Sequence, residues 1–265
     1  SLKSKKVTEE DIEDIFSIAQ KQEKTSNIEE FEKFELENNE DFNSLADFKE
    51  HLITCGLNPN YTRNILPFLQ YCGIIKYENI TAFENKKIFT NIGHVYIDIL
   101  KSISVLKLEP ESPEQKEILP LLERIQETIY FQCLVIMMKT LDCNYAIDFF
   151  DVLRFVAKYD FIDSKEYLLI QYEREQNSDN YIESMADIVK QYRDGTIDIN
   201  VKTKTKHADD GNAKSVNSFP YVNGNFTKAG VFYKSDGKFY IKEERRSEVE
   251  CAIREVGLLW QNSVK

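Results

Sequence analysis

Carboxylates close to a lysine are the first residues of this sequence whose types and spacing could do chemistry. In "DFIDSKEY" (160–167), Asp163 and Lys165 form a D-x-K pattern that follows Asp148 or Asp151. In metal-dependent nucleases, acidic residues on a sheet hold Mg²⁺, and a nearby Lys positions or activates water. A competing interpretation is that Asp163 or Ser164 caps a helix, since the surrounding sequence has helical periodicity. This second interpretation is the stronger, so Asp163 and Lys165 are weak catalytic candidates.

The sequence lacks the other common catalytic and metal-binding patterns. It has no P-loop, no G-x-G-x-x-G dinucleotide motif and no nucleophile elbow. Its three histidines, His51, His94 and His207, lie far apart, and its five cysteines form no C-x-x-C pair. A structural zinc site needs such closely spaced ligands. We therefore assign no metal ligand and no cofactor to this chain.

Cysteine usage and hydropathy predict a cytoplasmic protein. The five cysteines stand in apolar, helix-like contexts, as expected for reduced thiols in the cytosol. There is no visible signal peptide, and the longest apolar stretch, Tyr130–Met138, is too short to span a bilayer. We therefore expect no membrane partner. The chain begins without Met, at "SLKSKK", which suggests that flanking domains are absent from it.

Charge is distributed unevenly along the chain. The formal net charge of −11 argues against a general polyanion binder, because non-specific nucleic-acid binding depends on neutralising phosphates. Residues 1–60 and residues 106–195 each have a net charge of −8. Residues 61–105 have a net charge of +2, and residues 196–265 of +3. The two mildly basic blocks are therefore the places to look for a binding surface.

The first basic block has the element order of a winged-helix module. Helices are predicted over 44–56 and 61–73, followed by a β-prone ribbon and a helix over 93–103. In such modules the second helix enters the major groove and the ribbon contacts the DNA backbone. Arg suits guanine edges, Asn suits adenine edges, and Thr, Tyr and Lys suit phosphates. The candidate DNA-binding residues open the second helix or lie at the ribbon tip: Tyr61, Thr62, Arg63, Asn64, Lys86 and Lys87.

The second basic block repeats this pattern near the C-terminus. "KAGVFYKSDGKFYI" (228–241) and "YCGIIKYE…KKIFT" (71–90) both place a small residue and Gly before an apolar strand, a polar turn and a second strand. Asp236-Gly237 is a hairpin signal. The ribbon aromatics are interpreted as sheet core rather than base-stacking surfaces, and four side chains are predicted to face the core: Val231, Tyr233, Phe239 and Ile241. The candidate DNA-binding lysines are Lys202, Lys204, Lys206, Lys214, Lys228, Lys234 and Lys238.

Together these patterns predict a mostly helical α+β chain with short β-ribbons. Three of the six prolines lie in 107–120, which marks a boundary after the first ribbon module. The predicted organisation is two winged-helix-like modules joined by a helical brace. Its parts are an N-terminal helical segment (1–43), module 1 (44–105), an acidic helical brace (106–195) and module 2 (196–265).

Three stretches carry a family resemblance: "NILPFLQYCGIIKYEN…KKIFTNIGHVYIDIL", "YAIDFFDVLRFVAKYDFIDSKEYLLIQ…YIESMADIVKQYRDG" and "AGVFYKSDGKFYIKEERRSEVECAIREV". Together they resemble the DNA-recognition regions of bacterial type II restriction endonucleases, in particular the type IIS kind. There, winged-helix modules read DNA and a separate PD-(D/E)xK domain cuts it. The resemblance covers about residues 44–256. It implies sequence-specific binding of double-stranded DNA, a homodimer formed on DNA through parts outside this chain, and Mg²⁺ for the full enzyme.

This chain departs from that family in one respect, because it has no convincing PD…(D/E)xK pattern. The cleavage domain is therefore expected outside the chain. Three alternatives stay open. The chain could be a winged-helix transcriptional regulator, a protein-interaction scaffold, which the net charge of −11 favours, or itself a nuclease acting through Asp163 and Lys165.

Overall fold

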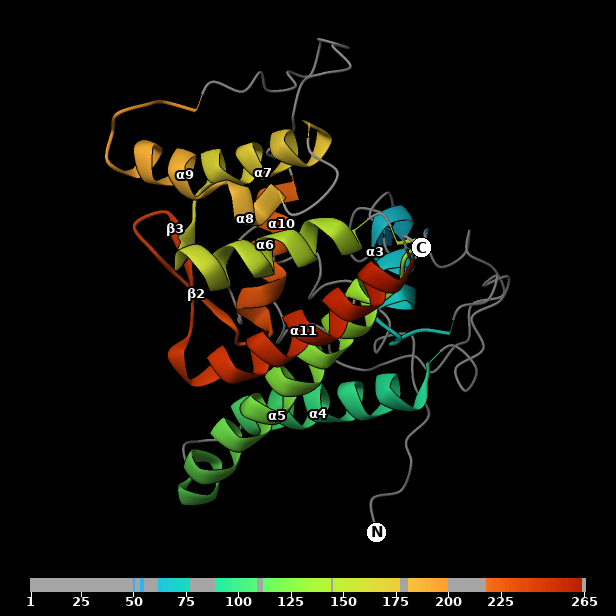
Figure 1. The fold of residues 1–265 in the computed structure, drawn as a ribbon. Coiled ribbons are helices and arrows are strands. Elements are labelled where there is room, and N and C mark those ends of the chain that lie inside the picture. The colour runs from blue at the N-terminus through green and yellow to red at the C-terminus, as the bar shows by residue number, and fades with distance from the viewer. Residues whose placement is uncertain are drawn as a thin grey trace. The chain divides into compact units, whose positions relative to one another are not determined.

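The fold is that of a computed structural model, which describes Glu50 and residues 53–54, 62–76, 89–108, 112–143, 145–176, 181–199 and 218–263. The chain divides into two compact units, Ser1–Cys143 and Asn144–Lys265. The described residues are mostly helical, with a three-stranded antiparallel sheet in the second unit (Figure 1). The prediction of a mostly helical α+β chain is therefore confirmed at this level.

The described part of the first unit consists of helices around one β-bridge. The helices are α3 (Thr62–Tyr71), α4 (Asn91–Leu108) and α5 (Pro113–Met138), and the antiparallel bridge joins Ile75 to Phe89. α4 and α5 pack through stacked Tyr96 and Tyr130 rings, whose centroids are 5.7 Å apart. Because both rings are buried, this contact belongs to the core of the unit.

The start of α5 follows from local sequence. The Ser112 hydroxyl accepts a hydrogen bond from the Gln115 N–H at 3.1 Å, and Pro113 occupies the first turn, where a missing N–H has no cost. The Gln115 side chain, in turn, donates to the Leu106 carbonyl near the end of α4. These contacts fix the connection between the two helices.

The second unit is a small sheet with helices around it. Its elements in chain order are α6 (Ala146–Tyr159), β1 (Phe161–Ile162), α7 (Ser164–Gln176), α8 (Tyr181–Ser184), α9 (Ala186–Arg193), α10 (Ser218–Lys228), β2 (Phe232–Ser235), β3 (Lys238–Ile241), the 3-10 helix η3 (Glu243–Arg245) and α11 (Arg246–Ser263). β3 lies between β1 and β2 and pairs antiparallel with both.

The core of the second unit is built around α6. Figure 1 shows this helix between α11 on one side and α7 and α9 on the other. Buried Phe149 of α6 packs against Phe226 of α10, with ring centroids 5.4 Å apart, and Phe226 packs against Phe232 of β2 at 4.8 Å. Burying one such side chain contributes roughly 1.5–3 kcal/mol, so this chain of rings holds the hairpin on the helices.

The end of α3 has a defined backbone conformation. Gly73 has a φ of +70°, a value that glycine adopts without steric cost. The Gly73 N–H donates to the Gln70 carbonyl at 2.9 Å, and the Ile74 N–H donates to the Leu69 carbonyl at 3.0 Å. This pair of bonds is a Schellman motif, which ends a helix and turns the chain.

The end of α10 has the same conformation. Gly230 has a φ of +64°. Its N–H donates to the Thr227 carbonyl at 3.0 Å, and the Val231 N–H donates to the Phe226 carbonyl at 2.9 Å. The two helices therefore end in the same way, 157 positions apart in sequence.

The similarity continues across the residues that follow. In the first unit the Thr90 N–H donates to the Ile74 carbonyl at 3.1 Å, and α4 starts at the next residue. In the second unit the Lys242 N–H donates to the Val231 carbonyl at 2.8 Å, and η3 then leads into α11. The helix end and the first cross-strand contact of the predicted repeat are therefore present in both units, while the turn of the first ribbon lies outside the described residues.

The segment expected to form an acidic helical brace also contributes to the sheet. β1 lies within residues 106–195, and Phe161 and Ile162 pair with Tyr240 and Phe239 of β3. The division between the two units likewise falls inside that segment, after Cys143. No helix among the described residues is long and apolar enough to cross a membrane.

Candidate functional site

The β2–β3 hairpin brings the ribbon lysines of the second unit together. Ser235 pairs with Lys238 beside the turn, and the two turn residues, Asp236 and Gly237, have φ values of +50° and +77°. Positive φ at both central positions is typical of a type I′ turn, which an Asp-Gly sequence favours. Lys234 and Lys238 therefore flank the tip from opposite strands.

One face of the sheet belongs to the core. Phe232 lies opposite Ile241, and Ile162 lies opposite Phe239. All four side chains are buried. The predictions that Phe239 and Ile241 face the core are confirmed.

The other face carries a row of three aromatic side chains. Phe161, Tyr240 and Tyr233 lie opposite one another across β1, β3 and β2. Phe161 and Tyr240 are half-buried, and Tyr233 is 45% exposed. The prediction that Tyr233 faces the core is wrong, because successive side chains of a strand alternate and its neighbour Phe232 occupies the buried side.

The rings of this aromatic row contact one another. The Tyr233 and Tyr240 rings are stacked, with centroids 5.2 Å apart and an interplanar angle of 18°. The Phe161 and Tyr240 rings are tilted by 46°, with centroids 5.4 Å apart. Cross-strand aromatic pairs of this kind stabilise a sheet by roughly 0.2–1 kcal/mol each.

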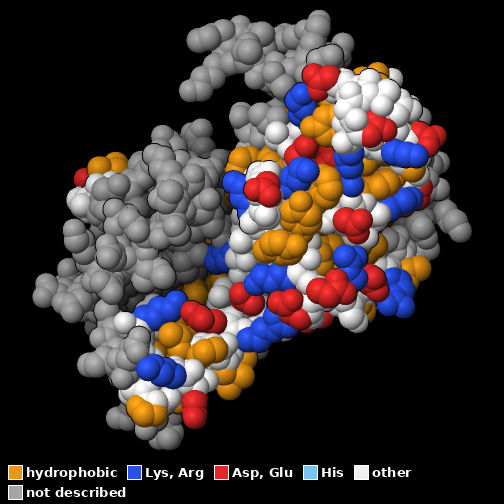
Figure 2. All heavy atoms as spheres, turned by 90° about the vertical axis from the view of Figure 1, so that its left-hand side faces the viewer, with side chains coloured by type: hydrophobic (Ala, Val, Ile, Leu, Met, Phe, Trp, Pro, Cys, Tyr) orange, Lys and Arg blue, Asp and Glu red, His pale blue; other side chains and the backbone are white. Residues whose placement is uncertain are grey.

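The ammonium groups of the two hairpin lysines lie over aromatic rings. The Lys238 Nζ lies 4.3 Å from the centroid of Phe161, and the Lys234 Nζ lies 5.7 Å from that of Phe239. Within the described residues, neither ammonium has a carboxylate at ion-pair distance. On the side of the molecule that carries the hairpin, Figure 2 shows apolar surface bordered by both basic and acidic side chains. The positive charges of Lys234 and Lys238 are thus available to a partner.

Arg193 anchors the β1 end of the aromatic row. Its guanidinium carbon lies 3.6 Å from the Phe161 ring centroid, and its Nη2 donates to the Phe161 carbonyl at 2.8 Å. Its Nη1 donates to the Tyr159 carbonyl at 2.5 Å. Its Nε donates to Glu166 Oε1 at 2.6 Å. One side chain from α9 therefore ties together the end of α6, β1 and α7.

Glu166 is the buried partner of Arg193. Its side chain is fully buried, and burial raises the pKa of its carboxyl, while the hydrogen bond and charge of Arg193 act in the opposite direction. The other carboxyl oxygen accepts the Asp163 N–H at 3.0 Å. Both oxygens are therefore held by the protein, and Glu166 has a structural role at the start of α7.

The weak catalytic pair Asp163 and Lys165 is placed at this same helix start. Asp163 Oδ1 accepts the backbone N–H groups of Lys165 and Glu166 at 2.9 and 2.8 Å, and with Glu166 it forms a reciprocal capping box. Asp163 Oδ2 accepts the hydroxyl of Tyr192 at 2.8 Å. The Lys165 ammonium pairs with Asp198. This geometry matches the helix-capping interpretation of the sequence.

Asp148 and Asp151, the acidic residues considered together with Asp163 and Lys165, form ion pairs with arginines. Asp148 pairs with Arg174 at 2.7 Å, and fully buried Asp151 accepts a bond from Arg154 at 2.8 Å. The hydroxyl of Tyr181 donates to the second oxygen of Asp151 at 2.5 Å. Burial raises the pKa of Asp151, while these partners favour its ionised form. No group of three or more potential metal ligands occurs among the residues that the structure describes.

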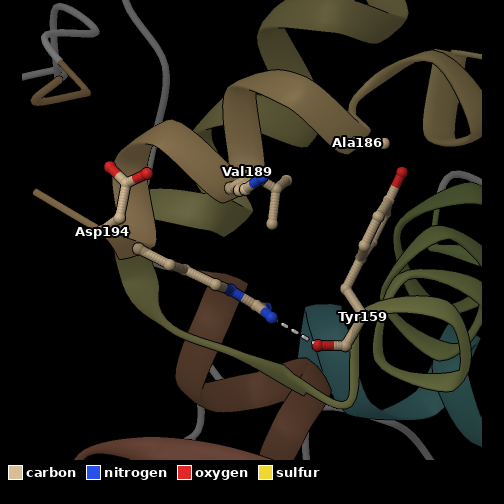
Figure 3. Close-up of a pocket in the computed structure, with 6 residues that line it drawn as sticks. Tyr159, Ala186, Val189 and Asp194 are labelled. Atoms are coloured by element: carbon tan, nitrogen blue, oxygen red, sulfur yellow. Dashed lines mark hydrogen bonds between the residues drawn. The ribbon is translucent and has the colours of Figure 1, made fainter. Parts of the chain in front are cut away.

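A hollow of about 400 Å³ lies beside the Arg193 anchor. Figure 3 shows the Tyr159 and Val189 side chains lining it, while the carboxylate of Asp194 points away. The Arg193 guanidinium is already engaged, and the Tyr159 hydroxyl donates to the Ile182 carbonyl at 2.7 Å. Most of the polar groups around the hollow therefore already form hydrogen bonds within the protein.

Several of the predicted DNA-binding residues fall outside the described part of the chain. They are Tyr61, Lys86, Lys87, Lys202, Lys204, Lys206 and Lys214. Thr62, Arg63 and Asn64 form the first turn of α3, but the orientation of their side chains is also outside the description. Lys228 lies in the last turn of α10. Only Lys234 and Lys238 are thus brought together at a described site.

The sequence alone did not point to Phe161 or Arg193. Phe161 belongs to a two-residue strand between helices, which has no periodicity to detect, and Arg193 looks like an ordinary basic residue in the last turn of a helix. Comparison with protein-family models, with curated proteins and with solved structures gives no significant match to this chain.

Proposed function

We propose that the chain binds double-stranded DNA through two winged-helix-like modules. In the second unit, α6, β1, α7, α10, β2 and β3 follow the order of such a module, with α8 and α9 inserted between α7 and α10, α11 after the hairpin, and β3 between β1 and β2. α10 would be the helix that approaches the major groove, and the β2–β3 hairpin would be the wing. The matching backbone bonds around Gly73 and Gly230 support a second module of the same kind in the first unit.

The observation that carries the proposal is the charge at the hairpin tip. Lys234 and Lys238 flank a tight turn, and neither is paired with a carboxylate of the described residues. A lysine that neutralises a phosphate releases counterions, and this release supplies much of the affinity of proteins for DNA. The overall negative charge of the chain then restricts DNA binding to such local basic surfaces.

The wider role proposed is sequence-specific recognition within a type II restriction endonuclease. Arg63 and Asn64, in the first turn of α3, are the proposed base-reading residues. Cleavage with Mg²⁺, and a homodimer on DNA, would depend on parts of the protein outside this chain. The engagement of Asp163 and Lys165 by their neighbours supports placing cleavage elsewhere.

Fluorescence anisotropy with labelled duplexes tests the proposal. The double variant Lys234→Ala/Lys238→Ala should bind more weakly than the unchanged chain. The slope of log K against log salt should become shallower by about 1.8, at about 0.9 for each lost phosphate contact. Lys158→Ala/Lys190→Ala is the matched control, since it removes the same charge from exposed lysines of α6 and α9.

Two results would refute the proposal. One is the absence of duplex binding by the unchanged chain at about 50 mM salt, where phosphate contacts are strong. The other is an equal loss of affinity in both double variants, which would mean that only net charge matters. Duplexes of different sequence, compared at one salt concentration, measure whether the binding is sequence-specific.

A further inference from the structure

Tyr233 is an exposed aromatic side chain at the open end of a row of rings. The sheet order places β2 at an edge, so Tyr233 has a ring neighbour in the sheet on one side, Tyr240. Within the described residues, neither of these two tyrosine hydroxyls has a hydrogen-bond partner. A tyrosine placed for the core usually directs its hydroxyl to a partner when it is buried. Apart from its stack on Tyr240, the Tyr233 ring is therefore exposed, with one side of the sheet edge open to a partner.

The other end of the row is closed. Phe161 is contacted by Arg193 at 3.6 Å and by Lys238 at 4.3 Å, both measured to its ring centroid. Tyr240 lies between Phe161 and Tyr233 and is half-buried. The Tyr233 ring is thus the surface of the row on which a planar group of a partner could stack, and the Tyr240 ring is stacked behind it.

Positive charge adjoins this aromatic surface. Lys238 lies two residues before Tyr240 on β3, so both side chains are on the same face of the sheet. The Lys238 ammonium lies close to the Phe161 ring, which belongs to the aromatic row. The residues from Phe232 to Lys242 include three lysines and one aspartate, Asp236. An aromatic face beside lysines is the combination with which proteins hold single-stranded nucleic acid, because the ring stacks on a base and the ammonium contacts a phosphate.

We infer that Tyr233, backed by Tyr240, stacks on an unpaired base of DNA, and that Lys238 contacts a phosphate of the same strand. The substrate preferred by the second unit is then a duplex with a single-stranded segment or an opened base pair, rather than a fully paired duplex. This inference rests on the proposed DNA binding and specifies its substrate. A fully paired duplex would keep its base faces covered, so the aromatic surface would add nothing there.

The test compares two DNA probes and two variants of one residue. The probes are a short blunt duplex and the same duplex with a single-stranded extension that contains the fluorescent base 2-aminopurine. Tyr233→Leu removes the ring but keeps an apolar side chain, and Tyr233→Phe keeps the ring. The fluorescence of Trp260, the single tryptophan of the chain, reports whether each variant retains the folded second unit.

The unchanged chain should bind the extended probe more tightly and quench its 2-aminopurine. Tyr233→Leu should weaken binding of the extended probe by about 5- to 150-fold, the range expected for losing one base–aromatic stack, and should abolish the quenching. Tyr233→Phe should retain both properties, since the stacking ring is still present. Binding of the blunt duplex should be nearly unchanged in both variants.

The outcomes separate this inference from the proposed function. Duplex binding that depends on the lysines, with no preference for the extended probe or with no effect of Tyr233→Leu, overturns the inference alone. Equal weakening of both probes by Tyr233→Leu also overturns it. Failure to bind either probe overturns both proposals. Quenching of the extended probe without any binding of the blunt duplex supports the stacking surface and overturns the duplex proposal.

Discussion

Replacing Arg193 by Met should strongly destabilise the second unit. The change removes the partner of Glu166, whose side chain is fully buried, and breaking such a pair by removing one partner typically costs about 3–5 kcal/mol. It also leaves the carbonyls of Tyr159 and Phe161 without their arginine donors, at about 1 kcal/mol each. We therefore expect a loss of about 5–7 kcal/mol in the free energy of unfolding, near the total stability of many domains.

The effect should depend on pH in a definite direction. The folded-state pKa of Glu166 is raised by burial and lowered again by Arg193, so removing Arg193 raises it further. A carboxyl with a raised pKa binds its proton more tightly in the folded than in the unfolded chain. The stability is therefore greatest when the group is protonated, and it falls as pH rises through the folded pKa. The cost of Arg193→Met should be largest at neutral pH and smaller at acidic pH, where Glu166 is protonated.

Urea unfolding followed by the fluorescence of Trp260 measures this cost, because this tryptophan lies on α11 and stacks on Phe150 of α6. The double variant Glu166→Gln/Arg193→Met is the control, since it removes the buried charge together with its partner. It should be more stable than Arg193→Met at neutral pH by about 2 kcal/mol or more. A cost below about 1 kcal/mol for Arg193→Met, or additive effects in the double-mutant cycle, would refute the reasoning.

Three further predictions concern local contacts. Asp163→Ala removes the cap of α7 and should cost about 1–2 kcal/mol in urea unfolding, whereas Asp163→Asn should retain most of the stability; equal costs would contradict the capping role. Tyr181→Phe removes a hydrogen bond to buried Asp151 and should cost about 1.5–3 kcal/mol, while a neutral effect would show that this bond contributes nothing. Gly93→Ala would place a methyl group 2.2 Å from a backbone carbonyl oxygen and should lower the melting temperature far more than Gly237→Ala, whose added methyl meets open space and whose cost is backbone strain alone. Similar melting temperatures for the two glycine variants would contradict this packing argument.

The features predicted well from sequence are those fixed by local chemistry. Gly73 ends its helix because glycine adopts positive φ freely, and Asp236-Gly237 makes a tight turn for a related reason. The Asp163 cap is likewise set by residues within one helical turn. These effects act over a few neighbours, so a short stretch of sequence contains the information.

The features missed depend on residues far away in sequence. β1 is a strand because β3 hydrogen-bonds to it, and two residues show no period that could reveal this. The exposure of Tyr233 follows from which side of the sheet the helices cover, and the hairpin sequence is aromatic on both faces. Arg193 matters through Glu166 and Phe161, which precede it by about thirty positions.

The pairing of β1 with β3 has a consequence for synthesis of the protein on the ribosome. Phe161 is translated 79 residues before its partner Tyr240, so β1 emerges long before β3 can cover its edge. During that interval α6 also lacks the Phe226 ring of α10 and the Trp260 ring of α11, which pack against it in the finished unit. The nascent chain therefore exposes an apolar helix and an unpaired strand until its last elements leave the ribosome, which is the period when a chaperone would protect it.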